Sequence, residues 1–351
     1  CSGDDYVKGL LDNYIIYVIP VINPDGYEQS FVINNRPNLR PRDANGDNIP
    51  YSDPYTDIDG DGFIATLYRG TADDTPSRDL PVFGMESPDW DENGILGDDP
   101  RTSGIDMNRT FDYQWNRYDI ETKDGQQVGN VNWTTAGTAP ATEPEIKALQ
   151  QFLYEHEIDA LVSLHTGIQS VLYPWCYRAY DANNPDDAEI PFMKETAAKM
   201  AQVFQDYTGR GFYSMSSNED YPTAAELIDY AYGRYNIHAY TIEVYSPGKS
   251  EDGDISACKW ENTMPEAKWV FYSRDEIRDV LGLAPDAITD SEGVGLAADE
   301  GLWFYTSPTN QMVNRAPEEQ DVMVRGCRDA ILTMIESEPS GSGYQNPGYY
   351  K

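Results

Sequence analysis

Two side chains in this sequence have the types and positions that hydrolytic chemistry uses. His165 ends an apolar segment, residues 160–165, and Glu243 ends another, residues 239–243. A histidine at a strand end can bind a metal ion, and a glutamate on a small, semi-polar strand face can act as a general base. Taken singly, each is more often structural, because most lone histidines are not ligands and most lone strand glutamates are solvated edge residues.

The patterns around these residues predict the elements that would position them. The predicted strands are residues 14–22, 160–165, 171–175 and 237–244. A capping box at 142–145 opens a predicted helix that carries apolar residues up to 153, a second helix covers 190–204, and the last starts near Pro317 and carries apolar residues up to 335. Strands that alternate with helices indicate an α/β fold, a three-layer sandwich with helices flanking a mixed, largely parallel twisted sheet. At the carboxyl edge of such a sheet the strand ends face one crevice, so His165 would lie there.

The chain is strongly acidic, which narrows its partners. Its 351 residues include 60 Asp and Glu against 25 Lys and Arg, a net charge of −35. Such a surface repels polyanions, so nucleic acid is not an expected partner. The longest apolar run, residues 14–22, is far short of the roughly 20 residues that a membrane span needs. We expect an extracellular or secreted protein, with a cell-surface lipoprotein anchored at Cys1 as the alternative.

Five blocks in order along the chain resemble the zinc metallocarboxypeptidases of the carboxypeptidase A/B class. They are residues 17–27 (YVIPVINPDGY), 104–111 (GIDMNRTF), 161–165 (LVSLH) with the 171–174 stretch, 221–232 with 240–243 (YTIE), and the closing helix with 331–335 (ILTMI). The resemblance implies one catalytic domain over residues 1–338. Acidic loop insertions at about 37–103 and 246–303 would interrupt it, and residues 339–351 would form a flexible tail.

The resemblance implies a role for each matching residue. His165 would be a zinc ligand, and Asn108 with Arg109 would clamp the terminal carboxylate of a peptide, since an amide and a guanidinium fork suit a planar anion. Glu243 would take a proton from zinc-activated water and pass it to the leaving amine. Tyr221 would close over the bound C-terminal residue. The implied activity is therefore release of C-terminal residues from peptides and proteins.

Two further positions follow from the same resemblance. Arg36 would polarise the scissile carbonyl and hold the developing oxyanion, with Arg40 as the fallback because the gap placement is ambiguous there. Ile228 falls where the family reads the substrate side chain. An apolar residue at that position implies a preference for hydrophobic or aromatic C-terminal residues.

The sequence departs from the family at the metal site. The family's other two zinc ligands lie in an H-x-x-E motif before the turn at residues 23–26, and no histidine precedes that turn here. We expect the motif upstream of Cys1, with a metal-free paralogue as the alternative. Two other functions therefore stay open: an inactive module that binds peptide C-termini, and a structural or assembly protein whose acidic insertions and tail contact other subunits.

Three acidic loops have the spacing of calcium-binding turns. Alternate residues offer hard oxygen ligands on a tight turn, which suits Ca²⁺. The candidate ligands are Asp57, Asp59 and Asp61, then Asp43, Asn45 and Asp47, and finally Asp89, Asp91 and Asn93. None has a glutamate at the twelfth position, so the loops would stiffen the structure and would not be sensor EF-hands. Ordinary Asp-Gly turns are the alternative.

Overall fold

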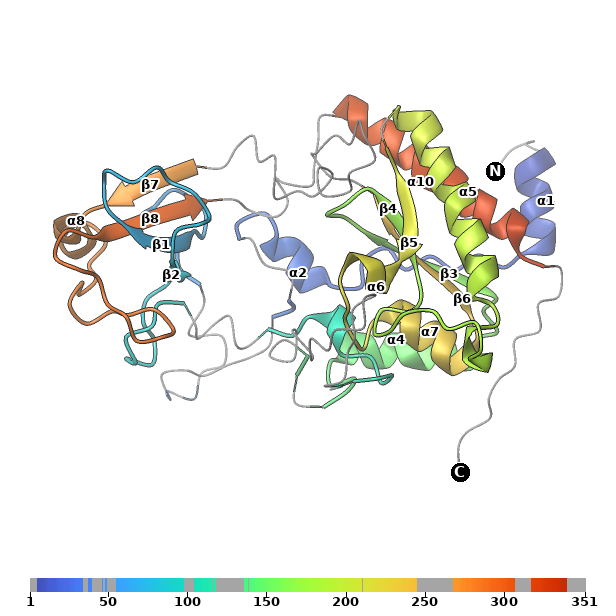
Figure 1. Ribbon diagram of the computed structural model, residues 1–351, viewed down its shortest axis with the longest axis horizontal. Coiled ribbons are helices and arrows are strands. Elements are labelled where there is room, and N and C mark those ends of the chain that lie inside the picture. The colour runs from blue at the N-terminus through green and yellow to red at the C-terminus, as the bar shows by residue number, and fades with distance from the viewer. Residues whose placement is uncertain are drawn as a thin grey trace.

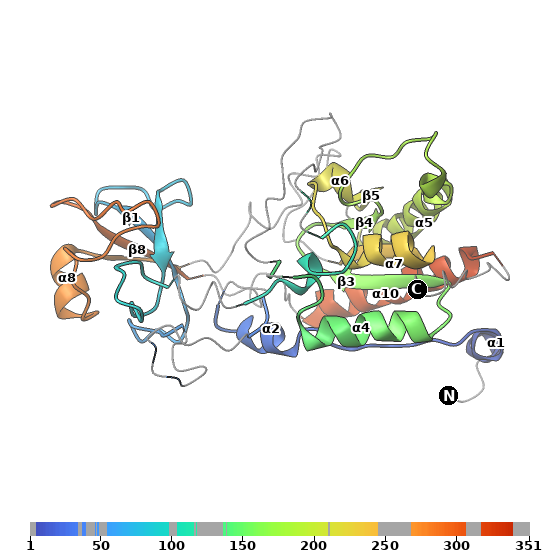
Figure 2. The same cartoon turned by 90° about the horizontal axis from the view of Figure 1, so that it is seen from below.

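The computed structural model contains two four-stranded sheets, which lie apart in both views of the molecule (Figure 1, Figure 2). The residues that it describes are 5–33, 37–39, 46, 48, 55–97, 104–115, 117, 136–137, 139–209, 211–244, 268–306 and 317–339. Within these ranges no helix is both long and apolar enough to cross a lipid bilayer.

The central sheet is mixed and carries the strands that the sequence predicted near His165 and Glu243. In spatial order its strands are β3 (Ala160–His165), β6 (His238–Glu243), β4 (Ser170–Tyr173) and β5 (Tyr213–Ser216). β3 and β6 run parallel, as do β4 and β5, whereas β6 and β4 are antiparallel. This arrangement confirms the predicted fold class.

Helices cover both faces of this sheet (Figure 1). Along β6, Tyr240 and Ile242 pack into one hydrophobic cluster and Ala239 into another, as the two-residue period of a strand requires. The first cluster includes residues of α5 and α10, and the second includes residues of α4 and α7. The bounds are α4 (Pro144–Glu155), α5 (Ile190–Thr208), α7 (Leu227–Tyr235) and α10 (Pro317–Ser337).

Short helices fill the connections between these elements. Two of them, η1 and α6, lie beside the strand ends and carry or precede candidate site residues. Their bounds are α1 (Asp5–Asn13), α2 (Pro24–Gln29), η1 (Met107–Arg109), η3 (Pro185–Asp187) and α6 (Ser217–Asp220).

The second sheet lies mostly inside the two segments that were expected to be irregular acidic loops, about 37–103 and 246–303, and one of its strands extends to Thr306. All its strand pairs are antiparallel. In spatial order they are β2 (Val82–Met85), β1 (Thr66–Gly70), β8 (Gly301–Thr306) and β7 (Lys268–Tyr272), and α8 (Arg274–Asp279) follows β7. Leu67, Phe83 and Phe304 fill its core. These short strands lie among Asp-Gly turns and pair with strands that are distant in the sequence. The local hydrophobic pattern therefore did not predict them.

The apolar run at residues 14–22 is not the buried strand that the sequence predicted. The chain there forms no strand, and the side chains of Ile15 and Val18 are 80% and 77% exposed. Tyr17 instead packs edge-on against Phe152 of α4, with ring centroids 5.1 Å apart. High strand propensity expresses fit to a pleated, half-buried surface. Among the described residues no strand pairs with this segment, so the propensity alone did not decide its structure.

A core substitution next to Glu243 tests the packing of β6. Ile242 is fully buried against the cluster that contains α5 and α10. We expect Ile242→Ala to lower the free energy of unfolding by ~2–5 kcal/mol, because it removes buried methyl groups and leaves a cavity. Val324→Ala, at a 65% exposed position on α10, is the matched control. Urea unfolding measures both, and equal effects would contradict the packing described here.

Candidate functional site

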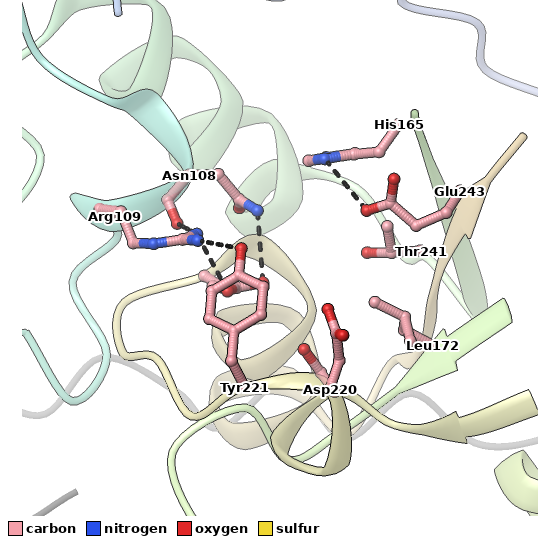
Figure 3. A pocket seen from close by; sticks show the side chains of 10 residues that line it. Asn108, Arg109, His165, Leu172, Asp220, Tyr221, Thr241 and Glu243 are labelled. Carbon is pink, nitrogen blue, oxygen red and sulfur yellow. Dashed lines mark hydrogen bonds and ion pairs between the residues drawn. The ribbon is translucent and has the colours of Figure 1, made fainter. Parts of the chain in front are cut away.

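The candidate site lies where the carboxyl ends of β3 and β6 meet. In the parallel register His165 stands opposite Glu243, and His165 Nδ1 lies 4.0 Å from Glu243 Oε1. Both side chains line one cavity (Figure 3). The structure therefore brings together the two residues that the sequence singled out at strand ends.

The helix η1 brings a second pair of residues to the same cavity. The Asp106 side chain accepts the backbone N–H of Asn108 at 3.0 Å, which fixes the start of this turn. The side-chain oxygen of Asn108 accepts the backbone N–H of Leu227 at 2.9 Å. Asn108 therefore ties η1 to the first residue of α7, and Arg109 follows it into the cavity wall.

The guanidinium of Arg109 is buried and surrounded by protein acceptors. Arg109 is 3% exposed. Its Nη1 lies 2.9 Å from Glu226 Oε1 and donates to the Asn108 carbonyl at 2.8 Å. Burial is the largest single influence and lowers the pKa of Arg109, but the nearby acidic groups, chiefly Glu226 and Asp106, together raise it by more, so the pKa lies above its ordinary value. The guanidinium is therefore charged at neutral pH.

Tyr221 comes to the site directly after α6. Arg109 Nη2 donates to the Tyr221 hydroxyl oxygen at 2.9 Å, and the Arg109 Cζ lies 5.8 Å from the centre of the tyrosine ring. Figure 3 shows Tyr221 directed toward Arg109, across the cavity from Glu243. The residue that was predicted to close over a bound peptide end thus contacts the predicted carboxylate clamp.

Sequence reasoning missed Glu226, which also lines the cavity. It precedes α7 at the N-cap position, where an acidic side chain commonly accepts a helix N–H. Glu226 makes no such cap and faces Arg109. In the sequence, the one indication that Glu226 belongs to the site is that it lies two residues before Ile228. An acidic residue before a helix is, however, usually interpreted as an ordinary helix cap.

One predicted site residue, Ile228, is not among the described residues that line the cavity, and the predicted oxyanion-binding arginine is not described. Ile228 is 1% exposed and belongs to the hydrophobic cluster beneath, with Met107 and Phe111. Its role in reading the substrate side chain therefore stays a prediction from the resemblance. Arg36, and its fallback Arg40, lie outside the described residues.

The acidic loops are ordered by backbone hydrogen bonds where they are described. The carboxylate of Asp57 accepts the N–H groups of Gly60 and Gly62, at 2.6 and 2.7 Å. Asp57, Asp59 and Asp61 each offer an oxygen within 4.8 Å of the others. Asp89 likewise accepts the N–H of Gly94 at 2.8 Å. In the same loop, Asp91 Oδ1 accepts the N–H of Asn93 at 3.1 Å. The remaining candidates, Asp43, Asn45 and Asp47, lie outside the described residues.

A buried carboxylate supports the first of these loops. Glu86 is fully buried and accepts the N–H groups of Ile58 at 2.7 Å and Ala65 at 2.8 Å. Burial raises the pKa of Glu86 to about 7, although these hydrogen bonds oppose the shift. Glu86 therefore anchors both ends of the Asp57 loop to the interior.

The described residues do not complete a zinc site. Catalytic zinc takes three protein ligands, and His165 is the one imidazole that lines the cavity in the part of the chain that the structure describes. His156 packs against Phe152, and His238 pairs with Glu338 at 2.6 Å. Over the same ranges, three potential ligands group closely only in the Asp57 loop.

A buried aspartate behind the site predicts a pH dependence of stability. Asp229 on α7 accepts the backbone N–H of Cys176 with both oxygens, at 2.9 and 3.0 Å. Mainly because it is buried, its pKa is raised to about 7, whereas an unfolded aspartate titrates near ~3.9. The folded protein therefore holds this proton more tightly. Stability falls as the pH rises between those two values.

Asp229→Asn tests this titration, because asparagine keeps an acceptor and cannot ionise. We expect the variant to resemble the wild type near pH ~4 and to be more stable by up to ~4 kcal/mol near pH ~8. Urea unfolding at several pH values measures the difference. If the two proteins lose stability with the same pH slope, Asp229 does not bind the proton as described.

Comparison with known proteins gives a consistent result. A family model described as "Zinc carboxypeptidase" matches residues 1–257. Mast cell carboxypeptidase A from Homo sapiens is 26% identical over 189 residues, which cover 48% of this chain and 41% of that protein. Zinc carboxypeptidase A 1 from Drosophila melanogaster is 25% identical over 238 residues, covering 67% of this chain and 40% of that protein.

A solved structure, the carboxypeptidase A from Helicoverpa armigera, matches with a TM-score of 0.37 and 16% identity, over 68% of this chain and 44% of that one. The chain spans well under half the length of the curated relatives that it matches. The family model nevertheless matches well over half of the 351 residues. The chain therefore belongs to the zinc carboxypeptidase family.

Proposed function

We propose that the protein is a zinc metallocarboxypeptidase that releases C-terminal residues from peptides. The observation that carries the proposal is the shared cavity: Arg109 and Asn108 line it together with the His165–Glu243 pair. Such a hydrolysis needs two groups in one place: one that binds a planar carboxylate and one that accepts a proton.

The chain's own groups divide the work as follows. Arg109 and Asn108 bind the terminal carboxylate of the peptide, and the Tyr221 hydroxyl, 2.9 Å from Arg109 Nη2, lies where it would contact that end. Glu243, at the end of β6, accepts a proton from the attacking water and returns it to the leaving amine. His165 would be one zinc ligand, and the other ligands are not among the residues described around the cavity.

A second function is favoured by that incomplete metal site. A cavity with a carboxylate clamp and one imidazole would bind a peptide C-terminus without cleaving it. Metal content separates the two functions, because the hydrolase requires bound zinc and the binding module does not.

The substrate class and the setting are finer parts of the proposal. Ile228 supports a preference for substrates with a hydrophobic or aromatic C-terminal residue, and this inference rests on the family resemblance alone. The net charge of −35 supports an extracellular location, where a highly charged surface keeps a protein soluble.

Hydrolysis of a blocked dipeptide with a C-terminal phenylalanine tests the activity. We expect bound zinc by elemental analysis, and a loss of ~10²–10⁴-fold in kcat for Glu243→Gln, because the variant lacks a general base. Glu219→Gln, an exposed substitution on α6, is the matched control. Zinc-free protein that binds the dipeptide without cleaving it would support the binding module. Faster release of a C-terminal arginine than of a C-terminal phenylalanine would contradict the apolar preference.

We also propose that the Asp57 loop binds a structural calcium ion. Support comes from its three closely grouped carboxylates and from the pair of contacts that link the loop to the second sheet. Tyr272 donates to Asp59 at 3.0 Å, and Thr306 donates to Asp61 at 3.3 Å. An ion there would offset the mutual repulsion of the carboxylates and stiffen the junction with β7 and β8.

Removal of calcium by EGTA is expected to destabilise the protein, by about 2.7 kcal/mol if the ion had been present at 100 times its Kd. Calcium, but not zinc, should restore the melting temperature and the resistance to protease. Asp59→Asn should abolish the effect, whereas Asp73→Asn, in an exposed turn of the same sheet, should retain it. An unchanged melting temperature in EGTA would leave the loop as an ordinary Asp-Gly turn.

A further inference from the structure

Glu226 occupies the groups that the proposed function assigns to the substrate. Its Oε1 lies 2.9 Å from Arg109 Nη1, and Asn108 Nδ2 donates to its Oε2 at 3.3 Å. The Thr223 hydroxyl also donates to Oε1. The amide and the guanidinium of the predicted carboxylate clamp therefore both hold a carboxylate that belongs to the protein.

The guanidinium has little capacity left for a second anion. Nη1 is shared between the Asn108 carbonyl and Glu226, and Nη2 donates to Tyr221. The buried Arg109 Nε makes no hydrogen bond to the described residues, and the single described partner of Nη2 takes only one of its two N–H groups. A carboxylate bound in the bidentate manner needs two parallel N–H groups. A carboxylate that bridges the two terminal nitrogens must therefore displace the Asn108 carbonyl or Glu226 from Nη1, where both N–H groups are taken.

The charge of the cavity also disfavours the binding of an additional carboxylate. The described residues that line it include the carboxylates of Asp220, Glu226 and Glu243 and the guanidinium of Arg109. A ligand carboxylate would add a further negative charge to a site that is already net negative by these groups. In a site with little water such repulsion is weakly screened.

We infer that Glu226 is an internal competitor for the peptide's terminal carboxylate. It holds Asn108 and Arg109 in the free protein, and it sets how strongly the site distinguishes a free C-terminus from a blocked one. The inference rests on the proposed carboxylate clamp. Binding of a peptide end is then an exchange of one carboxylate for another, so its net gain is smaller than that of filling an empty clamp.

The test compares two ligands that differ only at the end group, N-acetyl-phenylalanine and N-acetyl-phenylalaninamide. Calorimetry measures their binding to the wild type and to Glu226→Gln, which keeps an acceptor for its neighbours and removes the competing charge. We expect Glu226→Gln to bind the free acid ~10-fold more tightly than the wild type does, while the affinity for the amide changes less than ~2-fold. Glu219→Gln should change neither.

Arg109→Met separates the failure of this inference from the failure of the proposed function. If Arg109→Met abolishes a preference for the acid but Glu226→Gln leaves that preference unchanged, the clamp exists and Glu226 does not compete. If the wild type, Arg109→Met and Glu226→Gln all bind the acid and the amide equally, the clamp itself is wrong. N-acetyl-lysine is a further ligand for this test. If Glu226→Gln binds it more weakly than the wild type does, while the binding of N-acetyl-phenylalanine is unchanged, Glu226 contacts the substrate side chain and the inference is overturned.

A second variant covers the case in which Glu226→Gln does not fold, since it leaves the buried guanidinium without a full counter-charge. Thr223→Val removes the hydroxyl that donates to Glu226 Oε1 and keeps both charges in place. The carboxylate is then held less firmly, and we expect the acid to bind ~3-fold more tightly, with no change for the amide. An unchanged ratio of the two affinities in a folded Thr223→Val protein would count against the competition.

Discussion

A buried positive charge must be compensated by the groups around it, and Arg109 imposes this requirement on the whole candidate site. Its guanidinium draws in Glu226, which precedes α7, and Tyr221, which follows α6. Because the guanidinium is almost fully buried, loss of these partners would leave its charge uncompensated. The segments on this side of the cavity are therefore held together by the contacts of Arg109 and by the hydrogen bond from the Leu227 N–H to Asn108.

The other side of the cavity is fixed in a different way. His165 and Glu243 face each other because β3 and β6 pair in parallel with those residues in register. A slip of one residue would turn Glu243 to the opposite face of the sheet. Tyr240 and Ile242 prevent the slip, since both are buried against the helices on one face. The site thus joins a rigid sheet edge to a set of loops held by a buried charge.

The sequence predicted the parts of this arrangement that depend on local pattern. The strands that end at His165 and Glu243 were found because they are apolar runs of the right length, and the resemblance to known enzymes located Asn108 and Arg109. Glu226 was missed because its partner Asn108 is 118 residues away, and nothing near it in the sequence signals a buried ion pair. Residues 14–22 were misjudged for a related reason: strand propensity does not say whether a partner strand is present.

The strands of the second sheet are far apart in the sequence. β1 and β2 precede most elements of the sandwich, and β7 and β8 follow most of them. Trp303 of β8 donates to the carbonyl of Thr71, 232 residues earlier. A ribosome that adds 5–20 residues per second needs roughly 10–50 s to cover that distance. During synthesis the β1–β2 hairpin therefore stands with an unpaired edge and with Leu67 and Phe83 uncovered, a state that invites aggregation. Charged residues that flank a strand oppose such association, and the turn between β1 and β2 carries Asp73, Asp74 and Asp79.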